Sequence, residues 1–273
     1  MPVERTSDGR VGGWELKTGR QQLVEWLAWF ALVALTVFCW RVMTADTIWA
    51  FVEDAPKQAA DLFGRMLPPR WSYANNLWRP LWDTINIATL GTAIAIVIAT
   101  PLAFLAARNT SPSMLVVRPL ALLVIVSSRS VNALIWGLLL VAVLGPGVLA
   151  GIIAIALRSI GFIGKLLYEA IEEIDDRQVE AIRATGASQA QVIAYGIVPQ
   201  ILPAFATISV FRWDINIRES TVLGLVGAGG LGLALESSLN TLAWPHVSVI
   251  LLIILGTVVV SEWVTAEVRR RII

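Results

Sequence analysis

Charged side chains stand inside segments that are otherwise apolar, and they are the residues with the most scope for chemistry. Arg212, Asn216 and Glu219 are spaced four and three apart, so a helix would carry all three on one face. Asp214 and Arg218 are also four apart and would flank that face. Guanidinium groups bind both small oxyanions and carboxylates. The pattern therefore predicts either a polar path for an anion or ion pairs that hold helices together.

Arg129 lies in a second polar patch within an apolar segment. Its neighbours are Ser127, Ser128, Ser130 and Asn132. A charge at bilayer depth costs roughly 3 kcal/mol on insertion scales, so each one needs a partner or a polar path. Arg129 has no acid in its own segment, which favours a polar path for an anion over pairing. Arg158, in the next segment, would add positive charge along that path. For Arg218, pairing with Asp214 is favoured. The residues predicted to line a path are Arg129, Arg212, Asn216, Arg218 and Glu219.

The segments that carry these residues are long enough to cross a membrane. A spanning helix needs about 20 mostly apolar residues. Six segments qualify, at about 23–43, 84–107, 116–143, 147–168, 202–225 and 243–264. Only 15% of the 273 residues are charged, against about 25% in soluble domains. We therefore expect an all-α polytopic membrane protein with six transmembrane helices. Gly145-Pro146-Gly147 is expected to form the tight turn between the third and the fourth helix.

Lysine and arginine predict the orientation of these helices. Twelve basic residues gather on one side: Arg5, Arg10, Lys17, Arg20, Arg108, Arg118, Lys165, Arg177, Arg183, Arg269, Arg270 and Arg271. The other side has Lys57, Arg65, Arg70 and Arg79. Both termini are thus expected in the cytoplasm, with segments 1–22 and 265–273 on that side. The predicted core is 83–264.

The external loop, 44–82, is expected to contain an amphipathic helix at the membrane interface. Its apolar residues recur at helical spacing: Ile48, Phe51, Val52, Ala55, Ala59, Leu62, Phe63 and Met66. Charged and amide residues lie between them. Asp54 is predicted to cap this helix, with Pro56 in its first turn. Leu67-Pro68-Pro69 is predicted to end it.

The cytoplasmic loop at 169–203 is predicted to form two short helices. Asp175 and Asp176 mark the start of the first helix, and Gly186 suits a left-handed residue that would end it. Ser188 and Gln191 form a capping-box pattern at the start of the second. Such a compact helical loop is suited to receive force from another protein, although a mere connector is the alternative.

The same loop resembles the EAA loop of ABC importer permeases. That loop has Glu-Ala-Ala, three residues, Gly, nine residues, then Ile-x-Leu-Pro, and this chain matches it at Glu180, Ala181, Gly186 and Pro199. Three positions depart from it, with Ile182 for the second Ala, Gly196 for the Ile and Val198 for the Leu. The resemblance implies that an ATPase subunit docks here. The implied docking residues are Glu180, Ala181, Ile182, Thr185, Gly186, Ala187 and Pro199.

Further runs resemble the phosphonate branch of these permeases. They are Ile160 to Leu166, Glu180 to Ala187, Arg212 to Arg218 and Ser220 to Gly230, within a resemblance that covers about residues 80 to 273. The resemblance implies the type I importer fold, a homodimer, an ATPase pair and an extracytoplasmic solute-binding protein in a bacterial cytoplasmic membrane. It implies import of phosphonate, with phosphate or phosphite as alternatives. ATP and Mg would be used by the ATPase, and no cofactor by this chain.

Other functions fit the sequence less well. Gly227 to Gly232 matches GxGxxG, but a dinucleotide site needs a strand before it, whereas here a membrane helix precedes. A helix break or close packing is expected instead. The single histidine, His246, argues against a metal site and against a membrane-embedded enzyme. The chain has no P-loop with which to hydrolyse ATP, and nothing in its charge points to nucleic acid. An ion-coupled secondary carrier remains a rival, but it leaves the EAA spacing unexplained.

Overall fold

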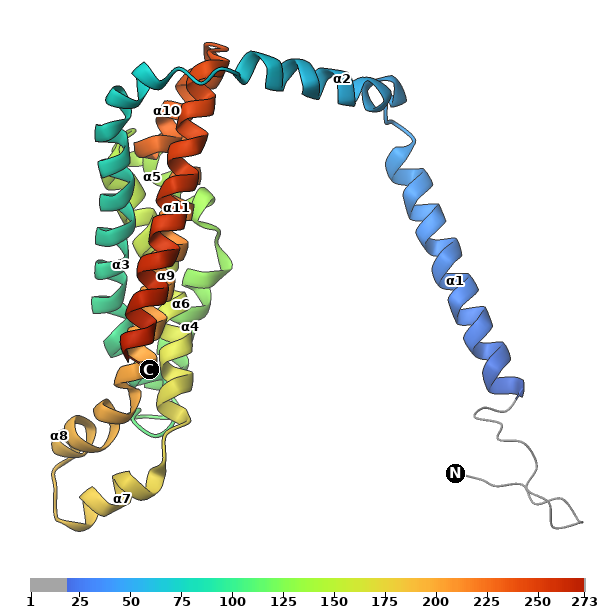
Figure 1. Cartoon of the computed structure of the whole chain (residues 1–273). Coiled ribbons are helices and arrows are strands. Elements are labelled where there is room, and N and C mark those ends of the chain that lie inside the picture. The colour runs from blue at the N-terminus through green and yellow to red at the C-terminus, as the bar shows by residue number, and fades with distance from the viewer. Residues whose placement is uncertain (1–18, 273) are drawn as a thin grey trace, which may run out of the picture. The chain divides into compact units, whose positions relative to one another are not determined.

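The computed structural model describes residues 19–272, with the side chains of 19–271, and every regular element in this range is helical (Figure 1). Most of the predicted N-terminal segment 1–22 therefore lies outside the described residues. The chain divides into two compact units, the first ending at Asp61 and the second beginning at Leu62. The all-α expectation is confirmed for the described range.

The first unit holds α1 (Gly19–Thr44) and most of α2 (Trp49–Met66). Helix α1 contains the predicted span 23–43. Helix α2 ends at Met66, before Leu67-Pro68-Pro69, as expected. The predicted cap at Asp54 is wrong, because the helix begins at Trp49 and Pro56 lies inside it. The apolar residues Phe51 and Val52 already follow the helical pattern, so the helix starts one turn before the acid.

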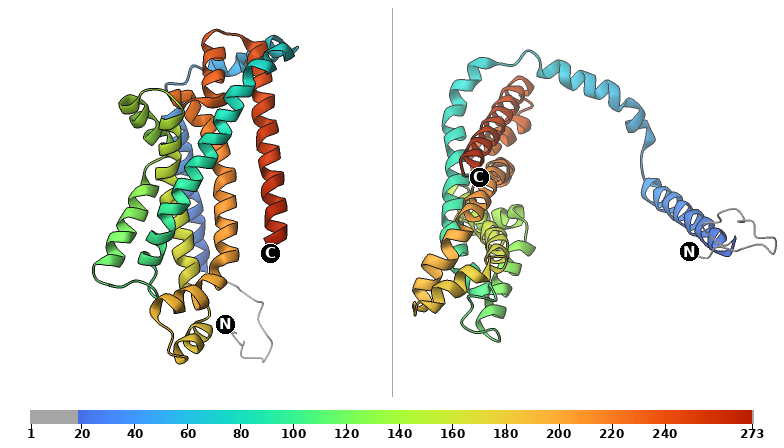
Figure 2. Two further views of the ribbon diagram at one scale, coloured as in Figure 1. Left: turned by 90° about the vertical axis from the view of Figure 1, so that its left-hand side faces the viewer. Right: turned by 60° about the horizontal axis from the view of Figure 1, so that its bottom comes forward.

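The second unit is a helical bundle centred on α6 (Val148–Glu172). Helix α6 contacts α3 (Trp78–Ala106), α4 (Val117–Ser130), α5 (Ala133–Leu144) and α9 (Val198–Leu223). Helix α11 (Trp244–Ile272) packs on α9 and on α10 (Gly230–Asn240). Figure 2 shows α4 and α5 on one side of this bundle and α11 on the other. Helix α9, which carries the buried residues Arg212, Asp214, Asn216 and Ser220, packs on α6 within this unit.

The two ends of the bundle differ in structure. At one end lie α10, the 3-10 helix Trp71–Leu77 and the starts of α3 and α11, joined by a bond from the Arg70 amide to the Pro245 carbonyl at 3.2 Å. His246 stacks on Tyr73 there, with ring centroids 4.2 Å apart. At the other end α7 (Asp176–Ala184) and α8 (Gln189–Val192) form a projection (Figure 1).

The third predicted span, 116–143, is not one helix. It is divided into α4 and α5, which are bent by 87° at Val131 and Asn132. Val131 is extended, and the Asn132 side chain accepts a bond from the Leu134 amide at 3.1 Å, which caps α5. Five of the described helices are long and apolar enough to span a membrane, and the bent pair would provide a sixth span.

The glycine-rich segment after α9 is a site of close backbone packing. A π-helical turn, Gly224–Ala228, ends α9, and α10 then starts at Gly230. A Cβ on Gly232 would collide with the Thr221 carbonyl oxygen and lie 2.7 Å from the Gly224 Cα. The GxGxxG match therefore reflects close helix packing, as expected, and helix α9 rather than a strand precedes it.

Replacing Gly232 is expected to destabilise the bundle. Gly232→Ala forces two backbone segments apart, so we expect a loss of about 1–3 kcal/mol or more, seen as a lower Tm of the purified chain in detergent. Gly256→Ala is the matched control, since a Cβ at Gly256 in α11 meets nothing within 4 Å. Equal melting temperatures for the two variants would contradict the packing described here.

Candidate functional site: a helical projection and a buried ion network

The projection at 169–203 has the two-helix structure that its sequence predicts. The Asp175 side chain caps α7 by accepting from the Arg177 amide at 3.0 Å. Ser188 and Gln191 form a complete capping box on α8, with bonds of 2.8 and 3.5 Å. A π-helical turn, Ile193–Ile197, then leads into α9. Both helix starts are therefore fixed by side chains that the local sequence identifies.

Gly186 connects the two helices. Its φ is +83°, in the left-handed region that favours glycine, and its amide donates to the Arg183 carbonyl at 3.0 Å. A Cβ there would meet nothing within 4 Å. The glycine is thus required by backbone conformation rather than by lack of space, and the turn stays open to a partner.

The predicted docking residues form an exposed ridge on a buried base. Glu180, Ala181, Thr185, Gly186 and Pro199 are exposed. Ile182 and Ala187 are partly buried and pack on an apolar cluster that includes Val179, Val192, Ile197 and Ile201, together with Leu167 and Ile171 of α6. The projection is therefore part of the bundle's core, and a force applied to the ridge would reach α6 and α9 directly.

Polar contacts strengthen the base of the projection. The Asp175 amide donates to Oε1 of Gln200 at 3.0 Å, which joins the start of α7 to α9. Asn109, in the loop after α3, donates through Nδ2 to the Ile171 carbonyl at 2.6 Å. Arg108 and Arg118 both pair with Glu172, at 3.8 and 3.6 Å. A cleft of about 260 Å³ opens beside α7, with Asp176, Glu180 and Arg183 in its lining.

The second polar feature is a network inside the bundle. Arg212 is only 2% exposed, and its Nη2 lies 3.0 Å from Oε2 of Glu219. Arg158 of α6 reaches the other oxygen of Glu219 at 3.4 Å. The Arg212 guanidinium also lies 5.0 Å from the ring centre of Phe162, a cation–π distance. Glu219 thus sits between two arginines of different exposure.

Asn216 extends this network towards α3. It donates through Nδ2 to Thr92 at 2.7 Å and to Ser159 at 3.0 Å, and Ser159 also accepts from Arg212 at 2.9 Å. Arg212 and Asn216, both predicted to line a path, are buried against α6 and α3 of the same chain. Ser159 of α6 and Thr92 of α3 bond to them there, and Glu219 of the same helix pairs with Arg212.

Arg218 belongs to a separate cluster between α9 and α11. It pairs with Asp214 in its own helix, as predicted, and with Glu262 at 3.2 Å. Ser261 donates to Oδ1 of Asp214 at 2.6 Å. Four further members of the two clusters were not predicted: Thr92, Ser159, Ser261 and Glu262. Each is a polar residue inside an apolar segment, which is the signal that could have identified it.

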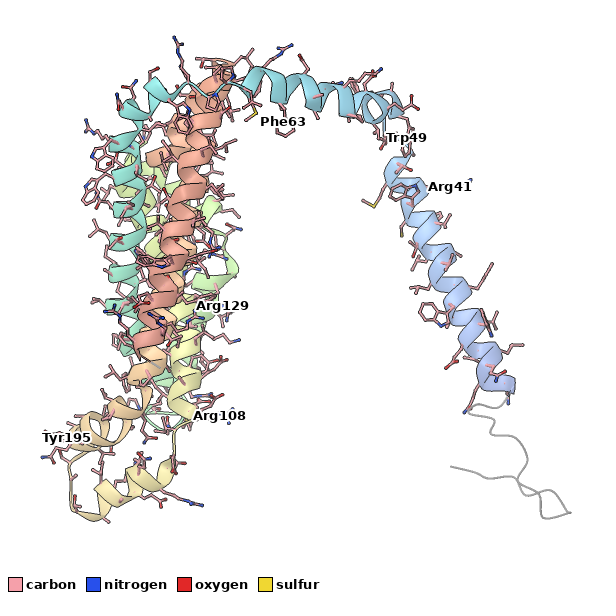
Figure 3. All side chains as sticks on the ribbon, viewed as in Figure 1. Arg41, Trp49, Phe63, Arg108, Arg129 and Tyr195 are labelled. Carbon is pink, nitrogen blue, oxygen red and sulfur yellow. The ribbon has the colours of Figure 1, made fainter. Side chains whose placement is uncertain are left out.

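Arg129 stands apart from both clusters. It is exposed at the end of α4, and Figure 3 shows it between the two ends of the bundle. Within residues 19–272 it makes no ion pair. Its Cγ lies against Gly161, one turn beyond Arg158 on α6. The five predicted path residues are therefore divided among three places: one buried network, one cluster at α11 and one exposed arginine.

Comparison with known proteins identifies the family. The model of the family described as "Binding-protein-dependent transport system inner membrane component" matches residues 99–273, which include α7, α8 and, except for Thr92, both polar clusters. The chain belongs to this family. It is therefore a multi-pass membrane permease component of an ABC transporter.

Relatives of this permease are named for phosphorus oxyanions. It is 40% identical to the phosphite transport system permease protein PtxC of Stutzerimonas stutzeri, over 94% of this chain and 90% of the relative. It is 38% identical to the phosphate-import permease protein PhnE of Mycolicibacterium smegmatis, over 87% of this chain and 44% of that longer relative. A cryptic phosphonate transport permease, PhnE2 of Escherichia coli, is 35% identical over 44% of this chain.

Solved structures support the fold. A chain of the inward-facing MetNI methionine ABC transporter has a TM-score of 0.62 and 20% identity, covering 72% of this permease and 96% of that chain. A chain of an amino acid ABC transporter has a TM-score of 0.63 and 19% identity, covering 73% and 95%. The expected type I importer fold is thereby confirmed, while identity this low says nothing about the substrate.

Proposed function

We propose that this permease forms the membrane path of an ATP-driven importer for phosphonate or a closely related phosphorus oxyanion, such as phosphite or phosphate. The observation that carries the proposal is the capped two-helix projection, built on the membrane core of a chain whose relatives are named for these anions. The chain itself supplies the route and the docking surface. ATP and Mg belong to a separate ATPase pair, so no catalytic residue is assigned here.

Docking of the ATPase is assigned to the exposed ridge of the projection. Glu180, Ala181 and Gly186 would contact a groove in the ATPase subunit, while Ile182 and Ala187 anchor the ridge in the core. This face would be cytoplasmic, together with both termini, because most loop lysines and arginines lie on that side. ATP binding would draw two projections together, and the spans above them would open outward.

The other partners follow from the need to enclose a path. One bundle has too few helices to surround a solute, so we propose that two copies pair in the bacterial cytoplasmic membrane. A solute-binding protein would deliver the anion at the α10 end. Arg129, exposed and without an ion pair among the described residues, is the first candidate for the path. Arg212, Asn216 and Glu219 would support the path from behind, and Arg218 would hold α9 to α11.

Removing Arg129 is expected to lower uptake without disturbing coupling. Arg129→Ala should cut anion uptake severalfold in proteoliposomes, because a charged donor contributes about 1.5–3 kcal/mol to a contact. ATPase stimulation by the binding protein should stay close to wild type, since the projection is unchanged. Wild-type uptake in this variant would remove Arg129 from the path.

The substrate is best tested through the cognate binding protein. Calorimetric titration with methylphosphonate, phosphite and orthophosphate should give tight binding of at least one of them. Uptake by the assembled complex should follow the same order of preference. A binding protein that retains none of the three anions and instead binds an amino acid would overturn the proposed substrate class.

A further inference from the structure

Arg158 links the ion network to the break in the third span. Its Nη1 donates to the Val131 carbonyl at 3.3 Å, while its Nε faces Glu219 at 3.4 Å. Val131 is the extended residue between α4 and α5 (φ −98°, ψ 130°). The same guanidinium therefore contacts α9 and the bend between α4 and α5, whose axes differ by 87°.

Both contacts of Arg158 are long for a charged group. Guanidinium–carboxylate bonds are usually about 2.7–2.9 Å, whereas Arg158 lies 3.4 Å from the Glu219 carboxylate. Its bond to the Val131 carbonyl, at 3.3 Å, also exceeds the usual N–H···O range of about 2.7–3.2 Å. Arg212 holds Glu219 at 3.0 Å and is 2% exposed, while the Arg158 side chain is 29% exposed. Of the two arginines on Glu219, Arg158 is thus the one that can exchange its partner.

The charges around this point favour an anion. Arg129, Arg158 and Arg212 bring three positive charges and Glu219 one negative charge, a formal excess of two. Arg129, at the end of α4, packs against Gly161 of α6, which lies one turn beyond Arg158. The acid Asp214 is occupied elsewhere by Arg218. An excess of two positive charges matches the charge of a phosphorus dianion.

We propose that Arg158 is the residue that receives the phosphorus oxyanion within the membrane, at the break between α4 and α5. The oxyanion replaces Glu219 as the partner of Arg158, and Glu219 keeps its shorter contact with Arg212. When the anion leaves, Arg158 pairs with Glu219 again. The Glu219 carboxylate therefore competes with the anion for Arg158 and keeps anion binding weak. This proposal rests on the proposed function and assigns the contact residue within it.

The test compares Arg158→Gln with Arg158→Lys in the complete transporter. Uptake of orthophosphate, phosphite and methylphosphonate and ATPase stimulation are measured on the same proteoliposomes. Arg158→Gln should lower uptake of the transported anion roughly tenfold or more and leave ATPase stimulation near wild type. Arg158→Lys keeps the charge and should retain most of the uptake. Arg41→Gln, an arginine near the end of α1, is the control and should behave as wild type.

A second measurement covers the case in which Arg158→Gln fails to assemble or loses its ATPase stimulation. Cys39 is the only cysteine, so Cys39→Ser followed by Ser130→Cys places a single thiol beside the break. The transported anion should slow modification of this thiol by a neutral maleimide, and adding Arg158→Lys should preserve the slowing. Unslowed modification with Arg158 present, or normal uptake by Arg158→Gln, overturns the proposal. A wild-type complex that transports none of the three anions refutes the proposed function instead.

Discussion

Gly186→Glu is expected to release the ATPase subunit while leaving the membrane bundle folded. The position is exposed and a Cβ would meet nothing within 4 Å, so the folding cost is limited to the left-handed backbone, about 1–2 kcal/mol. The new carboxylate stands on the proposed docking ridge, which also carries Glu180. We expect recovery of the ATPase by co-purification to fall roughly tenfold or more, which corresponds to about 1.4 kcal/mol of binding. Glu180→Lys should have an effect in the same direction.

A matched control exists at the other end of the bundle. Gly145, in the turn between α5 and α6, has φ +84° and equally open space around its Cβ position. Gly145→Glu adds the same charge at a position that is also strained for a side chain (ψ 165°), but away from the projection. It should leave ATPase recovery unchanged. If the two variants recover the ATPase equally, and Gly186→Glu is still stimulated by the binding protein, docking at the ridge is wrong.

Glu219→Gln is expected to be among the most destabilising changes in the polar network. It leaves Arg212, which is 2% exposed, without its carboxylate, and breaking a buried pair in this way costs about 3–5 kcal/mol. The thermal midpoint of the purified permease in detergent should fall clearly. Adding Arg212→Met should restore part of the loss, because the charge left without its partner is then removed as well.

Glu267→Gln provides the comparison. Glu267 also lies between two arginines, Arg270 and Arg271, and is 26% exposed, against 24% for Glu219. Its arginines are 78% and 77% exposed, so water solvates them once the carboxylate is lost. The expected loss is below about 1 kcal/mol. Similar melting temperatures for Glu219→Gln and Glu267→Gln would show that burial of Arg212 does not carry the stability assigned to it.

The local structure of the projection could be predicted because its signals are short in range. Asp175, Gly186 and the Ser188–Gln191 box each act on amides within three residues, so the sequence alone places both helix ends. The spans were predictable for a similar reason, since apolar length alone defines them. The break at Val131 was missed because a hydropathy window averages over Asn132, although asparagine is a common helix cap.

The partners within the bundle could not be predicted. That Arg212 and Glu219 share a helical face follows from spacing, but which helix covers them depends on how α6 and α3 pack against α9. The burial of Arg212 follows from this packing, which brings Ser159 to Arg212 and Thr92 to the neighbouring Asn216. The role of Arg158 depends on the same packing, because Val131 and Glu219 are brought to it by two different helices.

We expect this chain to move its anion only when an ATPase acts on the projection. The most direct measurement is uptake into proteoliposomes that contain the permease with or without the ATPase subunit, with the binding protein present. Uptake should require the ATPase and hydrolysable ATP, and Gly186→Glu should abolish it while Gly145→Glu retains it. Uptake by the permease alone, driven by an ion gradient and unaffected by Gly186→Glu, would contradict this dependence on the ATPase and indicate a secondary carrier.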